Sequence, residues 1–248
     1  MSSKRRMVEG LLQLKMASEC SDCRRCWRGN PEGDSEQDRV GRIVQEVIRR
    51  VRDEAVGDSK RLVPVGVSVR HVHLSQEALE RLYGPGSRVT KLRDLYQPGA
   101  YAAEQMVTLV GPRMRAIEGV RVLAPLRDYV QVELARTDGI LLGVDLPVRD
   151  SGNLDGATPV TLVGPKGSLT LPVAIRAIRH VHLSPADVER MGLQGVSKVR
   201  VRTMGPKALV FDNVVVKMGE EYIPDLHLDT DDANAADLVC GDRVEIEV

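Results

Sequence analysis

The alternation of apolar and polar residues changes character near residue 61. From there to the C-terminus, short runs of valine, isoleucine, leucine and threonine alternate with glycine and proline, as in VPVGVSV, MVTLVGP and RVEIEV. Such residues favour β-strands, and the glycines and prolines between them favour turns. Helical segments are few and short, so the pattern predicts a mainly β fold of compact β-barrels with small capping α-helices.

Residues 1–60 have a different pattern. A polar stretch, residues 28–38, leads into a segment, residues 36–55, whose apolar residues recur every three or four positions: Val40, Ile43, Val44, Val47, Ile48 and Val51. This spacing predicts an amphipathic helix with one narrow apolar face. The helix either packs on the core of its own protein or docks in a groove of a partner, and the spacing alone leaves both interpretations open.

One motif of six residues, Arg-His-Val-His-Leu-Ser, occurs twice, at residues 70–75 and 179–184. Side chains two residues apart in a strand project from the same face. Each copy therefore presents two imidazoles side by side: His71 with His73, and His180 with His182. The flanks repeat as well, since each copy follows an apolar run and leads into a helix start, such as the one at Ser184 and Pro185. The sequence therefore predicts two related units.

The fifth histidine, His227, lies in a variant of the same arrangement, at the end of an apolar run just before a capped helix. Paired imidazoles in a histidine-poor chain favour a metal site, with Zn²⁺ preferred and Co²⁺, Ni²⁺ or Cu²⁺ also compatible. His180, His182 and His227 would supply three ligands and leave one position open, as in a catalytic zinc site. The other pair needs a third ligand, and the spacing leaves two acids open for it, Glu133 and Glu104.

Arg127 is a candidate for binding an anion. It lies six residues before Glu133, so in a continuous strand it would share a face with Gln131 and Glu133 and hold an oxyanion through two parallel hydrogen bonds. A metal pair can polarise a carbonyl or activate an oxygen nucleophile. Water as the nucleophile predicts a hydrolase, whereas phosphate or a thiol predicts a transferase.

Composition narrows the range of partners. Lys and Arg balance Asp and Glu at 35 each, and the chain has one Trp and one Phe, so neither basicity nor aromatic stacking predicts nucleic-acid binding. No apolar run approaches the roughly 18 residues of a membrane span. Gln13 and Lys15 interrupt the apolar N-terminal stretch, which argues against a secretory signal. Cys20, Cys23 and Cys26 lie far from Cys240 and do not form a disulfide framework, so we expect a cytoplasmic protein.

Longer motifs carry a family resemblance. Residues 62–248 resemble the PduL-type phosphotransacylases (phosphate propanoyltransferases) through VPVGVSVRHVHLSQEAL, LRDLYQPGAYAAEQMVTLVGP, QVELARTD, PVRDSG, IRHVHLSPAD, LVFDNVVVK and LHLDTDDANAA. The resemblance implies an enzyme that interconverts acyl-CoA plus phosphate with acyl phosphate plus coenzyme A. It also implies two zinc ions between two β-barrel domains, and a place among the cargo of a bacterial microcompartment.

The resemblance also implies roles for single residues. It assigns one zinc to His71, His73 and Glu133, in preference to Glu104, and the other zinc to His180, His182 and His227. It places Arg127 at the phosphate-binding arginine, and it puts four further polar residues along the cavity: Ser68, Gln97, Gln131 and Ser151. The chain departs from the family at residues 102–105, AAEQ, where two acids are more common. It also has Lys217 where an arginine is common, which leaves anion binding there open.

We therefore expect an N-terminal extension at residues 1–60, a first β-barrel unit at 61–171 and a second at 172–248, and we allow for exchange of the N-terminal strand between the barrels. The expected activity is phosphate acyltransfer. The alternatives are a zinc-dependent acyl-CoA hydrolase and a non-catalytic, zinc-stabilised assembly module. In the family an N-terminal amphipathic helix is often an encapsulation peptide, so residues 36–55 are expected to contact a microcompartment shell or other cargo. Homo-oligomerisation is left open.

Overall fold

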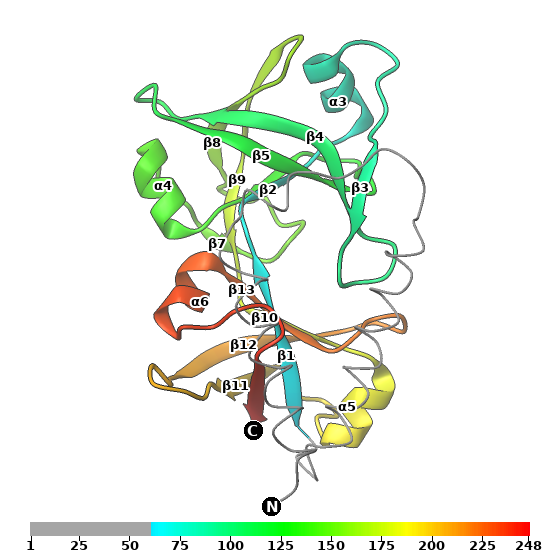
Figure 1. Ribbon diagram of the computed structural model, residues 1–248, viewed down its shortest axis with the longest axis vertical. Helices are drawn as coiled ribbons and strands as arrows, with labels where there is room; N and C mark the ends of the chain where they lie inside the picture. Colours follow the sequence, from blue (N-terminus) through cyan, green and yellow to red (C-terminus); the bar gives the residue numbers. More distant parts are fainter. Residues whose placement is uncertain (1–60) are drawn as a thin grey trace, which may run out of the picture. The chain divides into compact units, whose positions relative to one another are not determined.

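Fourteen β-strands and four short α-helices make up residues 61–248, the part of the chain that the computed structural model describes (Figure 1). The predicted helix at residues 36–55 and the cysteines Cys20, Cys23 and Cys26 lie outside this part. The strands form two closed barrels of six strands each, which confirms the predicted mainly β class. None of the helices within residues 61–248 is long and apolar enough to cross a membrane.

The first barrel closes through the neighbours β4–β5–β2–β6–β9–β8, with β8 pairing back to β4. Its strands are β2 (His71–His73), β4 (Tyr101–Val110), β5 (Ala116–Ala124), β6 (Gln131–Glu133), β8 (Thr158–Val163) and β9 (Ser168–Ala177). Two short strands extend it at the edges, β3 (Lys91–Asp94) beside β4 and β7 (Val148–Arg149) beside β9.

The second barrel closes through β1–β13–β10–β12–β11–β14. Its strands are β1 (Leu62–Ser68), β10 (His180–Leu183), β11 (Lys198–Arg202), β12 (Val210–Met218), β13 (Asp225–Asp229) and β14 (Arg243–Glu247). Each barrel has its own apolar core. Inward-facing residues alternate along the strands, as Val63 and Val65 do in β1, because successive side chains of a strand point to opposite faces.

The strand that leads into each His-Val-His motif belongs to the other barrel. β1 pairs with β13 and β14 of the second barrel, and the chain then enters β2 of the first. β9 pairs with β6 and β8 of the first barrel, crosses the expected boundary between residues 171 and 172, and leads into β10 of the second. Both histidine strands therefore start where the chain passes from one barrel to the other.

A short helix follows each of the four strands that carry the candidate ligands. These helices are α3 (Gln76–Tyr83), α4 (Arg136–Leu142), α5 (Pro185–Met191) and α6 (Thr230–Ala235). Side-chain caps fix three of these starts: Ser75 accepts from the backbone N–H of Ala78, Ser184 from that of Asp187, as the sequence predicts, and Asp229 from that of Asp232. At the start of α4, Ala135 has no capping side chain, and its backbone N–H donates to Oδ2 of Asp138 instead. A capped helix start ends each strand at a defined residue, which fixes where the preceding ligand lies.

Candidate metal centre

The two histidine strands have the same partner and the same register in their respective barrels. β2 pairs antiparallel with β6, which places His71 opposite Glu133. β10 pairs antiparallel with β13, which places His180 opposite His227. Directly opposite residues in an antiparallel pair have their Cβ atoms about 4.5–5.5 Å apart, so each histidine pair meets a third candidate ligand across the ladder.

The first group consists of His71, His73 and Glu133, and all three are buried. Their candidate ligand atoms all lie within 4.8 Å of one another. Nε2 of His71 is 3.6 Å from Oε2 of Glu133, and Nε2 of His73 is 3.9 Å from Oε1. The geometry therefore brings Glu133 to the histidine pair. Glu104 is exposed on β4 and joins neither group.

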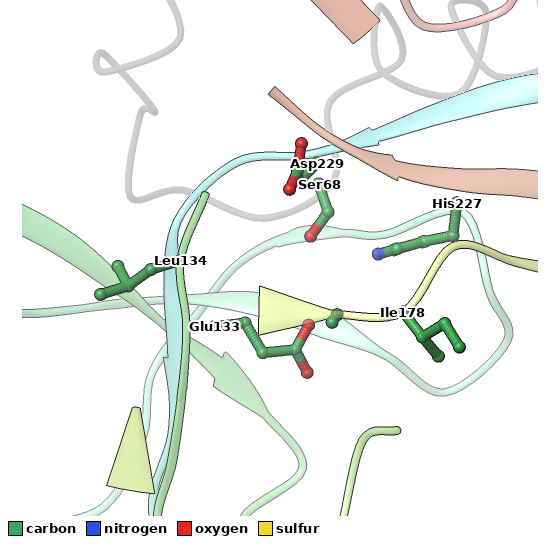
Figure 2. Close-up of a pocket in the computed structure, with 7 residues that line it drawn as sticks. Ser68, Glu133, Leu134, Ile178, His227 and Asp229 are labelled. Atoms are coloured by element: carbon green, nitrogen blue, oxygen red, sulfur yellow. The ribbon is translucent and has the colours of Figure 1, made fainter. Parts of the chain in front are cut away.

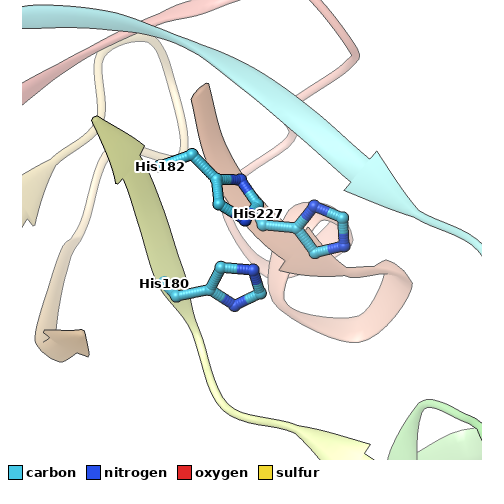
Figure 3. Close-up of side chains that lie close together, drawn as sticks. All are labelled: His180, His182 and His227. Atoms are coloured by element: carbon cyan, nitrogen blue, oxygen red, sulfur yellow. The ribbon is translucent and has the colours of Figure 1, made fainter. Parts of the chain in front are cut away.

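The second group consists of His180, His182 and His227, whose rings gather between β10 and β13 (Figure 3). Their candidate ligand atoms also lie within 4.8 Å of one another. The rings of His180 and His227 are stacked, with centroids 4.8 Å apart, and the ring of His182 stands edge-on to both. His180 is buried, whereas His182 and His227 are half-buried.

The hydrogen bonds of the rings fit a metal ion. Nδ1 of His71 lies 2.9 Å from the carbonyl oxygen of Val69, and Nδ1 of His180 lies 2.8 Å from that of Ile178. A carbonyl can only accept, so both rings carry a proton on Nδ1, and a metal ion would bind at Nε2, as in metal-bound histidines. Nδ1 of His73 is buried without a hydrogen-bond partner among the described residues, which favours a partner from outside the chain.

The charges of the first group fit a metal as well. Burial would raise the pKa of Glu133, but the charge and hydrogen bond of His71 overcome this and hold the pKa well below its usual range. Glu133 is therefore an anion at neutral pH. Burial and the charge of His71 lower the pKa of His73 to about 3, so this ring is neutral, the form that binds metal.

Two rings of the second group, those of His180 and His227, are neutral for related reasons. Burial, together with the charges of His227 and Lys217, lowers the pKa of His180 to about 2. Burial lowers the pKa of His227 to about 4, against the opposing charge of Asp225. Both rings are therefore neutral near pH 7 and present unprotonated nitrogens to a cation.

One residue of each group lines a shared pocket (Figure 2). Glu133 of the first group and His227 of the second point into it, with the hydroxyl of Ser68 beside them. Ser68 ends β1 and Ala177 ends β9, so the strand crossing itself forms part of the wall. Ser68 lines this pocket, and its Oγ is 3.4 Å from Nδ1 of His71.

A chain of hydrogen bonds joins Arg127 to the first group. Nη1 of Arg127 donates to the hydroxyl oxygens of Tyr129, at 2.7 Å, and Ser151, at 3.1 Å. Nε2 of Gln131 donates to Ser151 Oγ at 2.8 Å and to Glu133 Oε1 at 2.6 Å. The structure therefore brings four predicted site residues together. Within residues 61–248, Arg127 has no carboxylate at ion-pair distance, so its charge is available for an anion.

The route by which Arg127 reaches the site differs from the expectation. The predicted continuous strand from Arg127 to Glu133 is wrong, because β6 contains only Gln131–Glu133. The backbone N–H of Arg127 instead donates to the carbonyl oxygen of Leu74, at 2.9 Å. This bond fixes the loop between β5 and β6, and the side chain reaches Ser151 from there.

Gln97 lies in the loop between β3 and β4, and its amide bonds to the second barrel. Nε2 donates to the carbonyl oxygen of Ile223 at 2.7 Å and to Oδ1 of Asp225 at 2.6 Å. Oε1 accepts from the N–H of Ile223 at 3.1 Å. Gln97 is not among the residues that line the pocket of Figure 2.

The sequence reasoning missed two acids. Asp225 is 3% exposed, and its Oδ1 lies 2.8 Å from Nδ1 of His182. The available signal was its position two residues before His227, which places both on one face of β13. Asp150 forms an ion pair with Lys217 at 2.5 Å, linking the residue before Ser151 to β12 of the second barrel.

Comparison with known proteins gives a single family. The family model described as phosphate propanoyltransferase matches residues 64–239. A phosphate propanoyltransferase of Thermotoga maritima is 46% identical over 205 residues, covering 82% of this chain and 94% of the relative. One from Lachnoclostridium phytofermentans is 41% identical over 212 residues (85% and 99%), and one from Salmonella typhimurium 43% over 196 residues (78% and 91%). On the strength of these matches and the site that the shared motifs build, the chain belongs to the phosphate propanoyltransferase family.

Proposed function

We propose that the protein is a phosphate acyltransferase that interconverts a short-chain acyl-CoA and phosphate with acyl phosphate and coenzyme A. Family membership supports the reaction class. The observation that carries the proposal is one pocket lined by Glu133 of the first group and His227 of the second, with the uncompensated charge of Arg127 linked to Glu133 through Ser151. A reaction between a thioester and a phosphate needs a site for an anion next to a site for a carbonyl.

We propose zinc as the metal, with two ions. One would be held by His71, His73 and Glu133, and the other by His180, His182 and His227. Imidazole nitrogens and one carboxylate are common zinc ligands, and three protein ligands leave a coordination position for substrate. When bound, such an ion supplies positive charge that polarises a carbonyl and stabilises a developing oxyanion or thiolate.

The side chains of the first barrel would bind phosphate. Arg127 uses Nη1 for Tyr129 and Ser151, and a guanidinium has five N–H donors in all. The remaining donors match two oxygens of a phosphate. In the forward reaction a phosphate oxygen forms a bond to the acyl carbon, the carbon–sulfur bond breaks, and coenzyme A leaves as the thiolate. Ser151 and Gln131 fix Arg127 relative to Glu133, so phosphate would bind at a fixed distance from the reacting carbonyl.

The direct test is product analysis with purified protein. Acyl-CoA and phosphate should give acyl phosphate and free coenzyme A in equal amounts, and omitting phosphate should abolish coenzyme A release. Release that is independent of phosphate would establish the runner-up, a zinc-dependent acyl-CoA hydrolase. Running the assay with acetyl-, propionyl- and butyryl-CoA would give the acyl-chain preference.

The variant His227→Ala tests the other alternative, a non-catalytic, zinc-stabilised assembly module. A catalytic second group predicts a folded, inactive protein, whereas a structural one predicts loss of folding along with loss of metal. Far-UV circular dichroism and activity, measured on the same preparation, distinguish the two.

We also propose that residues 36–55 direct the enzyme into a bacterial microcompartment, where they would contact shell proteins or other cargo. The support is the predicted apolar face of this segment together with the family resemblance. Deleting residues 36–55 in the native host should shift the protein from the shell fraction to the soluble fraction. Retention in the shell fraction would contradict the assignment.

A further inference from the structure

Because the two histidine groups share one register, each residue of one group has a counterpart in the other. The counterparts are His71 and His180, His73 and His182, Glu133 and His227, and Gln131 and Asp225. Each set of four thus has one carboxylate, at a different position. In the first it is the third ligand, Glu133. In the second it is Asp225, opposite the second histidine.

Asp225 contacts the second group through its own hydrogen bonds. It is 3% exposed, and a buried carboxylate is unfavourable unless it is paired. Its Oδ1 lies 2.8 Å from Nδ1 of His182, and its Oδ2 lies 4.0 Å from Nδ1 of His227. A Cβ atom at Gly66 of β1 would come within 2.6 Å of Oδ2, so the glycine leaves room for the carboxylate. The carboxylate fixes the tautomer and orientation of His182, with the proton on Nδ1 and Nε2 left for a metal ion.

Gln97 connects this carboxylate to the first barrel. Its Nε2 donates to Oδ1 of Asp225, the same oxygen that contacts His182. Its other two hydrogen bonds go to the backbone of Ile223, in the loop between β12 and β13. Nearby, the hydroxyl of Tyr96 donates to the carbonyl oxygen of Pro224 at 3.3 Å. The loop between β3 and β4 of one barrel therefore holds the segment that leads into Asp225 and His227 of the other.

We propose that Asp225 and Gln97 are positioning residues for the second metal group. Asp225 supplies, one hydrogen bond away from the ion, the negative charge that Glu133 supplies directly to the first group. Gln97 holds Asp225, so the second group has its full affinity only when the loop between β3 and β4 is docked on the second barrel. This inference rests on the proposed metal sites and goes beyond them, because neither residue is a ligand.

The test is a Co²⁺ titration of the metal-free full-length protein, followed by its visible absorption. Asp225→Asn keeps the shape of the side chain and removes its charge. It should lower the affinity for one of the two bound ions by about 10–100-fold and leave the affinity for the other unchanged. Gln97→Ala should lower the affinity for the same ion by a smaller factor. Asp138→Asn is the matched control: Asp138 is also 3% exposed, but it pairs with Arg70 and caps α4, so the second ion should keep its affinity.

A double variant assigns the weakened ion. In a His180→Ala background, which lacks the second group, Asp225→Asn should have no further effect on the remaining ion. Equal weakening of both ions, or no weakening in Asp225→Asn and Gln97→Ala, would overturn the inference and leave the proposed function intact. Failure of the wild-type protein to bind two ions would instead remove the metal sites on which both rest. If Asp225→Asn does not fold, Gln97→Ala decides, with Gln105→Ala as its control, since the amide of Gln105 bonds only within the first barrel.

Discussion

The two histidine groups have the same strand pattern but distribute charge differently. In the first, all three candidate ligands are buried and one is an ionised carboxylate. In the second, all three are imidazoles and two are half-buried. A dication would therefore be partly neutralised by its own ligands in the first group but not in the second.

The residues around the two groups also differ in charge. On the parallel neighbour strand, Leu123 lies beside His73, whereas Lys217 lies beside His182. Lys217 is paired with Asp150, and Arg127 is linked to Glu133 through Ser151. The comparison shows that one repeated strand arrangement gives two groups of different charge when the residues on the strands paired with the histidine strand change.

The largest effect should come from removing the charge of Glu133, the one anionic residue among the six candidate ligands. Glu133→Gln leaves the hydrogen bonds to Gln131 and Ser151 possible but removes the charge that would neutralise a bound ion. Activity should fall on the order of 10²-fold or more, since even outer-shell changes cost about 10–100-fold. Metal content per chain should fall from two ions to one. Full metal content with full activity would show that the first group is not a metal site.

Substitution of Arg127 should change the KM for phosphate selectively. Arg127→Ala removes charged hydrogen bonds worth about 1.5–3 kcal/mol, so the KM for phosphate should rise by about 10–100-fold, with little change in the KM for acyl-CoA. Arg127→Lys keeps the charge without the planar fork and should recover part of the loss. Steady-state kinetics with each substrate varied in turn would check this, and an equal rise in both KM values would contradict phosphate binding at Arg127.

Acid should destabilise the metal-free protein through the buried imidazoles. The pKa values of His73 and His180, about 3 and about 2, lie below the ordinary value of 6.5, so the unfolded chain takes up protons first as the pH falls below 6.5. Each such residue removes about 1.4 kcal/mol of stability per pH unit in this window. His71 opposes the trend, because Glu133 raises its pKa despite burial.

Urea denaturation of the metal-free protein at pH 8 and pH 5 measures the net effect, and the midpoint should be lower at pH 5. His180→Gln, which does not titrate, should reduce the difference. A midpoint that rises towards pH 5 would show that the pair of His71 and Glu133 outweighs the neutral rings.

The smallest effect concerns the ion pair between the barrels. Asp150 is about half exposed, and such pairs are worth about 0–1 kcal/mol. Asp150→Asn should therefore free Lys217 at little cost in stability and lower the KM for phosphate by about two- to fivefold. Lys217→Met should raise it by a similar factor. If neither substitution moves the KM, Lys217 has no part in anion binding, and the positive charge of the site comes from Arg127.

Local sequence patterns predicted much of this site, because its main signals are local. Residues two positions apart in a strand share one face, so the sequence alone placed His71 beside His73 and His180 beside His182. Spacing alone left Glu104 and Glu133 open, and the family resemblance favoured Glu133, the acid that the geometry brings to the pair.

The remaining features depend on which strands pair with each other, and local sequence patterns do not reveal the pairing. β1 and β9 are both apolar runs before a histidine motif, and neither shows which barrel it joins. The contact between His182 and Asp225 follows from the register of β10 and β13, which are 43 residues apart at this contact. Arg127 reaches Ser151 from a loop, so strand periodicity could not place it.

The most direct test of the account is a crystal structure of the zinc-loaded protein with anomalous data at the zinc edge. We predict two anomalous peaks in each chain. One should lie among His71, His73 and Glu133, and the other among His180, His182 and His227. A single peak shared by both groups, or zinc bound at other residues, would contradict the claim that the duplicated strands form two separate metal sites.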